Sequence, residues 1–94
     1  MHWRTPTLVQ KVKHFLSERK RLTLIADTPE VRFKIATYKS PKYPHPKQYR
    51  LTYESHYANF RWEAQVCDKP EYLQKTAEDY YSQWQQEQMN VLTP

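Results

Sequence analysis

Basic side chains dominate the first half of this sequence. Residues 1–50 hold twelve Lys and Arg against three Asp and Glu, a formal charge of +9, whereas residues 51–94 carry −4. Clustered cations neutralise phosphates and release condensed counterions, so this half is suited to nucleic acid; an acidic protein surface is the alternative partner. The candidate contact residues are Lys11, Lys13, Lys20, Arg21, Arg32, Lys34, Lys39, Lys42, Tyr43, Lys47 and Arg50.

Tyrosines lie among these cations. Tyr38, Tyr43 and Tyr49 could stack on unpaired bases while neighbouring lysines contact the backbone. Residues 39–47 read KSPKYPHPK, and three prolines in nine residues exclude a continuous strand. We therefore expect an exposed, extended loop here that helps to dock a protein groove or a nucleic-acid strand.

The remaining reactive side chains do not form a recognisable site. The four histidines and the single cysteine, Cys67, lack the short paired spacings of a zinc site, so no metal and no cofactor are expected. Nothing in the sequence pairs Cys67 with a base, and it is interpreted as a small apolar side chain. The chain is predicted not to be an enzyme; a small enzyme using Cys67 or a histidine remains the weakest alternative.

The sequence contains no glycine in 94 residues. Dinucleotide-binding loops, Walker A loops, nucleophile elbows, EF-hand loops and the KH clamp all need glycine, so these classes are excluded. The length predicts one domain spanning residues 1–94. What remains is a small binding protein.

Two helices are expected, one near each end. Apolar residues after Thr5-Pro6 recur at helical spacing and predict a first helix of about four turns, with Thr5 as its N-cap. A second helix of about 20 residues begins near Asp68-Lys69-Pro70-Glu71, which has the spacing of a capping box. The apolar stripe of the first helix is Leu8, Val9, Val12, Phe15 and Leu16. That of the second is Leu73, Ala77, Tyr80, Trp84, Gln88 and Val91.

Strands are expected between the helices. Residues 31–36, 49–54 and 60–66 alternate apolar and polar side chains, and residues 22–26 form a short apolar run. The predicted fold is α+β: a three- or four-stranded antiparallel sheet with both helices on one face, in the order α-(β)-β-β-β-α.

This element order resembles that of double-stranded RNA-binding domains. That family begins its second helix with lysines that clamp phosphates, whereas this chain has Asp68-Lys69-Pro70-Glu71 there. The sequence therefore assigns no family, and any nucleic-acid contact is expected on the first helix and the loop.

Two hypotheses of function follow. In the first, the basic half binds nucleic acid through phosphates with low sequence specificity, and Lys13, Lys20, Arg32, Lys34 and Lys47 gather on one continuous surface. In the second, these cations are scattered, and the chain is an adaptor, assembly factor or small inhibitor that docks an acidic protein through the loop and exposed aromatics.

Location and self-association are also open to prediction. The N-terminal residues have no apolar signal-peptide region, no run is apolar enough to span a membrane, and a single cysteine suits a reducing compartment. A cytoplasmic protein with no membrane partner is expected. Fourteen aromatic side chains in a small domain favour at least one interface, and a homodimer is one form it could take.

Overall fold

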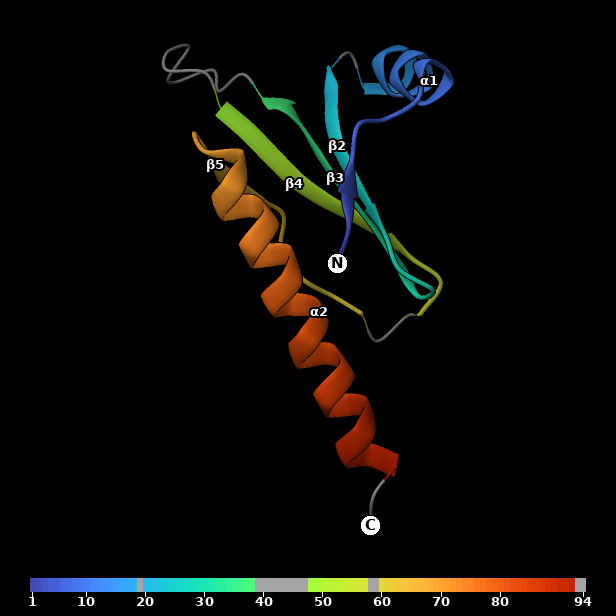
Figure 1. Cartoon of the computed structure of the whole chain (residues 1–94), viewed down its shortest axis with the longest axis vertical. Helices are drawn as coiled ribbons and strands as arrows, with labels where there is room; N and C mark the ends of the chain where they lie inside the picture. Colours follow the sequence, from blue (N-terminus) through green and yellow to red (C-terminus); the bar gives the residue numbers. More distant parts are fainter. Residues whose placement is uncertain (19, 39–47, 58–59, 93–94) are drawn as a thin grey trace.

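The computed structural model of the chain describes residues 1–18, 20–38, 48–57 and 60–92. Its elements are β1 (Trp3–Arg4), α1 (Leu8–Glu18), β2 (Leu22–Asp27), β3 (Val31–Tyr38), β4 (Gln48–Ser55), β5 (Gln65–Cys67) and α2 (Pro70–Leu92). The predicted loop at 39–47 lies outside the described residues. Figure 1 shows the sheet between the two helices, with α2 extending beyond the ends of the strands.

The predicted fold class is confirmed. All neighbouring strands are antiparallel, and their order in the sheet, β1-β2-β3-β4-β5, follows the order in the sequence. The turn between β2 and β3 contains no glycine, and the Thr28 side chain adds to its backbone bond. The Thr28 amide and hydroxyl donate to the Val31 carbonyl at 2.9 and 2.8 Å, and the hydroxyl accepts from the Val31 amide at 2.9 Å. The chain is thus a meander framed by a helix near each end.

The main core lies between α2 and one face of the sheet, here called the core face. Phe33 and Ile35 of β3 and Leu51 of β4 meet Leu73, Ala77 and Trp84 of α2. Phe60 is central, because its ring contacts those of Phe33, Tyr53, Trp62 and Trp84 at centroid distances of 5.0 to 6.4 Å. Aromatic volume therefore supplies much of the apolar burial in this small domain.

The Tyr81 hydroxyl ties α2 to the turn between β2 and β3. It donates to Glu30 Oε2 at 2.5 Å. Burial, the hydrogen bond to this carboxylate and its negative charge raise the pKa of Tyr81, although a contact with Thr28 acts in the opposite direction. This hydrogen bond adds a polar contact to the apolar packing of α2 on the sheet.

The ends of the sheet differ from the sequence prediction. Residues 60–66 were expected to form one strand, but only Gln65–Cys67 pairs with β4, and Phe60 is buried within a non-strand segment. Alternation alone was misleading here, since the buried ring of Phe60 and the partly buried ring of Trp62 pack on α2 and the neighbouring aromatics rather than in a ladder. The two-residue strand β1 was not predicted.

The first helix begins later than predicted, at Leu8, and its N-cap is Thr7 rather than Thr5. The Thr7 hydroxyl accepts from the Gln10 amide at 3.3 Å, and Gln10 Oε1 accepts from the Thr7 amide at 2.9 Å. This Thr-x-x-Gln capping box satisfies two donors that the helix itself leaves unpaired. Residues 3–4 are consequently available to pair with β2.

Loss of this cap has a measurable expected cost. Thr7→Ala removes the hydroxyl acceptor and should destabilise the protein by about 1 kcal/mol. Urea unfolding followed by circular dichroism measures the change. Thr76→Ala is the control, because the Thr76 hydroxyl bonds a carbonyl within α2 and caps nothing; an equal loss in both variants would contradict the assigned cap.

Two details of the predicted packing are corrected: the two helices do not share one face of the sheet, and α1 does not bury its apolar stripe. Leu8, Val9, Val12, Phe15 and Leu16 are between 48% and 77% exposed. The helix instead turns polar residues toward β2, and His14 is buried at 8% exposure. The core face is already filled by α2 and the segment around Phe60, so α1 lies against the other face, where a small second cluster of Leu22, Ile25 and Ala36 is buried.

Candidate nucleic-acid interface

Strand register separates the two faces of the sheet. Since paired residues in an antiparallel ladder share a face, Arg4, Ile25, Lys34 and Thr52 line up across β1 to β4 on the side away from α2. Arg32 and Arg50 belong to the same side by alternation along β3 and β4. This side is called the basic face below.

A groove runs between α1 and the basic face. It has a volume of about 270 Å³ and takes its cations, Lys13, Arg32 and Lys34, from one helix and one strand. Gln10, His14 and Ser17 complete the helical wall, and Leu22 and Ile25 form part of the strand wall. Residues distant in sequence thus present positive charge to one open hollow.

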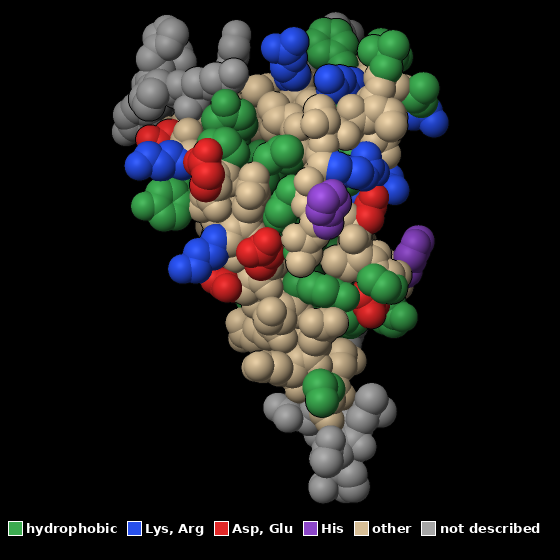
Figure 2. Space-filling view, in the orientation of Figure 1, with side chains coloured by type: hydrophobic (Ala, Val, Ile, Leu, Met, Phe, Trp, Pro, Cys, Tyr) green, Lys and Arg blue, Asp and Glu red, His purple; other side chains and the backbone are tan. Residues whose placement is uncertain are grey.

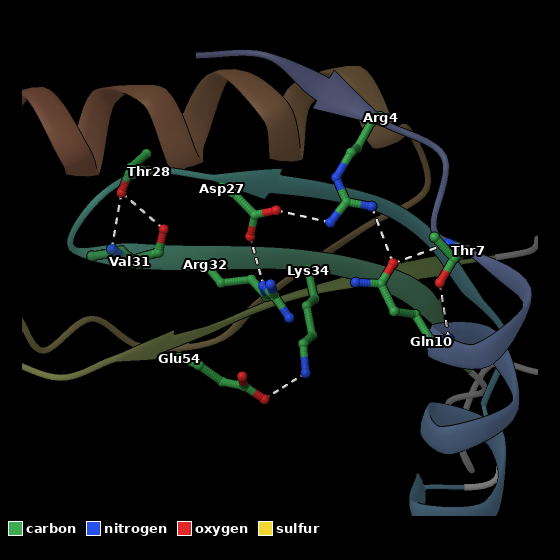
Figure 3. Close-up of polar contacts among 9 residues, drawn as sticks. All are labelled: Arg4, Thr7, Gln10, Asp27, Thr28, Val31, Arg32, Lys34 and Glu54. Carbon is green, nitrogen blue, oxygen red and sulfur yellow. Dashed lines mark hydrogen bonds and ion pairs between the residues drawn. The ribbon is translucent and has the colours of Figure 1, made fainter.

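Two carboxylates partly neutralise the basic face. Asp27 accepts from Arg4 Nη2 at 2.8 Å and from Arg32 Nε at 2.6 Å, and Glu54 pairs with Lys34. Figure 3 shows these side chains projecting from the strands on the side away from α2, with Gln10 of α1 joined to Arg4 at 3.0 Å. The pairs hold the arginines in place and leave other guanidinium donors available.

The two arginines also set the charge state of Asp27. Burial alone acts to raise the pKa of Asp27, but the hydrogen bonds and positive charge of Arg4 and Arg32 outweigh it and hold that pKa below the ordinary 3.8. A lowered pKa in the folded state means that unfolding takes up protons in acid. The stabilisation is therefore present above about pH 3.8 and is lost as the pH falls through the folded-state pKa.

This linkage gives a pH-dependent prediction. Asp27→Asn should lower the free energy of unfolding at pH 7 by no more than about 1 kcal/mol, because the pair is solvent-exposed and screened. The difference from the wild type should shrink toward zero below the folded-state pKa. Urea unfolding at pH 7 and in strong acid measures the difference between the two proteins. A difference that persists undiminished in strong acid would contradict the lowered pKa of Asp27.

Tyr38 gathers two more cations at the end of β3. Lys20 Nζ lies 4.8 Å from the centre of the Tyr38 ring, and the Arg50 guanidinium carbon lies 5.9 Å from it. Cation–π contacts of this kind hold charge without neutralising it. Among the described residues, no ion pair joins Lys13, Lys20 or Arg50 to a carboxylate.

The structure brings together part of the predicted site. Lys13, Lys20, Arg32, Lys34 and Arg50 all lie on the side formed by α1 and the basic face. Lys11 and Arg21 do not, because they border a separate hollow beside the exposed stripe of α1. Lys39, Lys42, Tyr43 and Lys47 lie outside the described residues.

Sequence reasoning also missed or misplaced residues. Arg4 joins the basic face only because β1 pairs with β2, and a two-residue strand leaves no periodic signal. Tyr49, proposed as a stacking side chain, packs against the core with Cys67 as its strand partner. Tyr38 is on the basic face, but cations cover its ring.

The other reactive groups remain dispersed. Cys67 is half-buried, and its thiol contacts Asp68 Oδ1 at 3.5 Å. No group of three or more metal-ligating side chains occurs within residues 1–18, 20–38, 48–57 and 60–92. A hollow of about 360 Å³ at the β2–β3 turn carries mixed charge, including Glu30, Arg32 and His56.

Charge is unevenly distributed over the visible surface as well. In Figure 2, Lys and Arg side chains gather around the end that bears α1, while the tapered end formed by the last turns of α2 shows none among the described residues.

Neither described helix is long and apolar enough to cross a membrane.

Comparison with protein-family models, with curated proteins and with solved structures finds no match for this chain. The functional argument therefore rests on the geometry of the basic face.

Proposed function

We propose that this protein is a non-catalytic nucleic-acid-binding protein that contacts phosphates through its basic face, with low sequence specificity. The observation that supports this most is the gathering of Arg4, Lys13, Lys20, Arg32, Lys34 and Arg50 on one side of the fold. Only Asp27 and Glu54 oppose them in ion pairs among the described residues of that side.

The shape of the site fits a charged backbone better than a small ligand. Lys13, Arg32 and Lys34 border an open groove, and Arg4 and Arg50 extend the positive charge onto the neighbouring strands. Phosphates repeat along a nucleic-acid strand, so a row of separated cations can contact several of them. The acidic outer side of α2, with Glu71 and Asp79 exposed, would repel the same strand and so restrict binding to one side.

A cytoplasmic location belongs to this proposal, with the single cysteine as its support. Docking of an acidic protein on the same cations is the competing function. Binding of an acidic protein would also depend on these positive charges. It would not release the condensed counterions that a nucleic acid carries, so its affinity would fall less steeply with salt.

Salt dependence of binding tests the proposal. Binding to labelled single- and double-stranded DNA and RNA is measured by fluorescence anisotropy from about 50 to about 300 mM salt. A phosphate-dominated site predicts a linear fall of log K with log salt, with a slope of about −0.7 to −0.9 for each phosphate contacted. Absence of binding at the lowest salt would overturn the nucleic-acid function and leave the acidic protein as the partner to pursue.

A further inference from the structure

Helix α1 is oriented opposite to an ordinary surface helix. Gln10, Lys13, His14 and Ser17 line the groove that it forms with the sheet. The apolar strip, defined as Leu8, Val9, Val12, Phe15 and Leu16, faces outward and is 48% to 77% exposed. A soluble domain rarely leaves so continuous an apolar patch uncovered, so this strip is suited to a partner surface.

The strip is symmetric about its own centre. Val12 is the middle residue, Val9 and Phe15 lie three positions to either side, and Leu8 and Leu16 lie four positions to either side. Reversing the helix direction about Val12 therefore superimposes apolar positions on apolar positions. A self-complementary patch of this kind is what a two-fold interface between identical chains requires.

We propose that α1 pairs antiparallel with the α1 of a second copy, about a two-fold axis at Val12. In this arrangement Leu8 faces Leu16 of the other copy, Val9 faces its Phe15, and the two Val12 side chains meet. Because the polar residues of α1 point toward its own sheet, the two sheets lie on opposite outer sides of the helix pair and do not obstruct it.

The area is sufficient for a specific but modest interface. The five residues of the strip expose on the order of 600 Å² per copy, so two copies bury up to about 1,200 Å², the lower end of specific interfaces. The pair leaves both basic faces open. The proposal is independent of nucleic-acid binding and concerns the opposite side of α1.

Charges at the rims give the dimer a distinctive salt dependence. At 100° per residue, Lys11 flanks the strip on the side away from the groove, and the two-fold axis brings it next to its own counterpart. Salt screens this repulsion and should strengthen the dimer, whereas it weakens an interface with an acidic partner or a nucleic acid.

Sedimentation equilibrium of the full chain without nucleic acid tests the proposal. The wild type should dimerise with increasing concentration, and more strongly at about 500 mM than at about 100 mM salt. Val12→Lys places two like charges on the axis and should weaken the dimer by at least roughly 30-fold, as should Val12→Glu alone. Mixing these two variants should restore association, because the Lys and Glu side chains then face each other at position 12.

Tyr72→Ser is the matched control, because Tyr72 is 59% exposed on α2 and lies outside the strip; it should leave the dimer unchanged. Circular dichroism verifies that each variant is folded, as expected for exposed positions. A wild type that is monomeric at the highest concentration overturns the proposal. Flotation with phosphatidylserine vesicles, or binding of a synthetic acidic amphipathic peptide, would then identify what covers the strip.

Register is tested by cysteine pairing in a Cys67→Ser background. Val12→Cys should oxidise to a covalent dimer, because position 12 meets itself across the axis. Leu16→Cys alone should not, but it should cross-link when mixed with Leu8→Cys. Efficient cross-linking of Leu16→Cys with itself would contradict the antiparallel register.

Discussion

Replacing Lys13 and Arg50 together with alanine should weaken nucleic-acid binding by roughly tenfold at about 100 mM salt and flatten the salt dependence by about two phosphate contacts. Both side chains lie on the side formed by α1 and the basic face, and neither is in an ion pair with a carboxylate among the described residues. Their charges are thus available to phosphates without first breaking an internal pair. Anisotropy titrations at several salt concentrations give both quantities.

The control removes the same charge from the other side of the molecule. Lys69 lies directly before α2 and Lys75 lies within it, and their double alanine variant has the same net charge as the Lys13 and Arg50 variant. Lys69 also contacts a tyrosine ring, Tyr72, as Arg50 contacts Tyr38. An equal loss of affinity in both variants would indicate a general charge effect and would contradict a localised interface.

The largest stability effect is expected at Phe60. Phe60→Ala should lower the free energy of unfolding by about 3 to 5 kcal/mol, because it opens a cavity among Phe33, Tyr53, Trp62 and Trp84. Since small domains have only about 5 to 15 kcal/mol of stability, much of the fold is at risk. Thermal and urea unfolding, monitored by tryptophan fluorescence, measure the loss.

Tyr72→Ala provides the comparison for Phe60, because it removes an aromatic ring that is mostly exposed on α2. Its cost should stay below about 1 kcal/mol. If Phe60→Ala proved as mild, Phe60 would not anchor the core, which would contradict the packing described here.

The sequence predicted those elements whose signal is long and periodic. α2 begins at Pro70, within the predicted start, and Leu73, Ala77 and Trp84 of its stripe are buried. β2 to β4 were also placed close to their observed bounds. Short or irregular pieces were missed, because a two-residue strand has no periodicity and the aromatic segment after Phe60 alternates without pairing.

The position of α1 could not be predicted from its own pattern. Amphipathicity defines an apolar side but not what covers it, and the usual assumption that the core does so was wrong here. α2 and Phe60 fill the core face, which leaves His14 and its polar neighbours to contact the sheet. The basic face was predicted only in part. Alternation along the strand placed Arg32 and Lys34 on one side, whereas the position of Arg4 depends on the pairing of β1 with β2.

The central claim is that nucleic acid binds the basic face, and nuclear magnetic resonance tests it most directly. A short single-stranded oligonucleotide is titrated into the ¹⁵N-labelled chain at low salt, and amide shifts are followed. The account predicts that the changes concentrate at Lys13, Lys34 and Arg50 and their neighbours, and that Lys75 and Asp79 on α2 stay unchanged. Changes confined to α2, or none at all at saturating oligonucleotide, would contradict it.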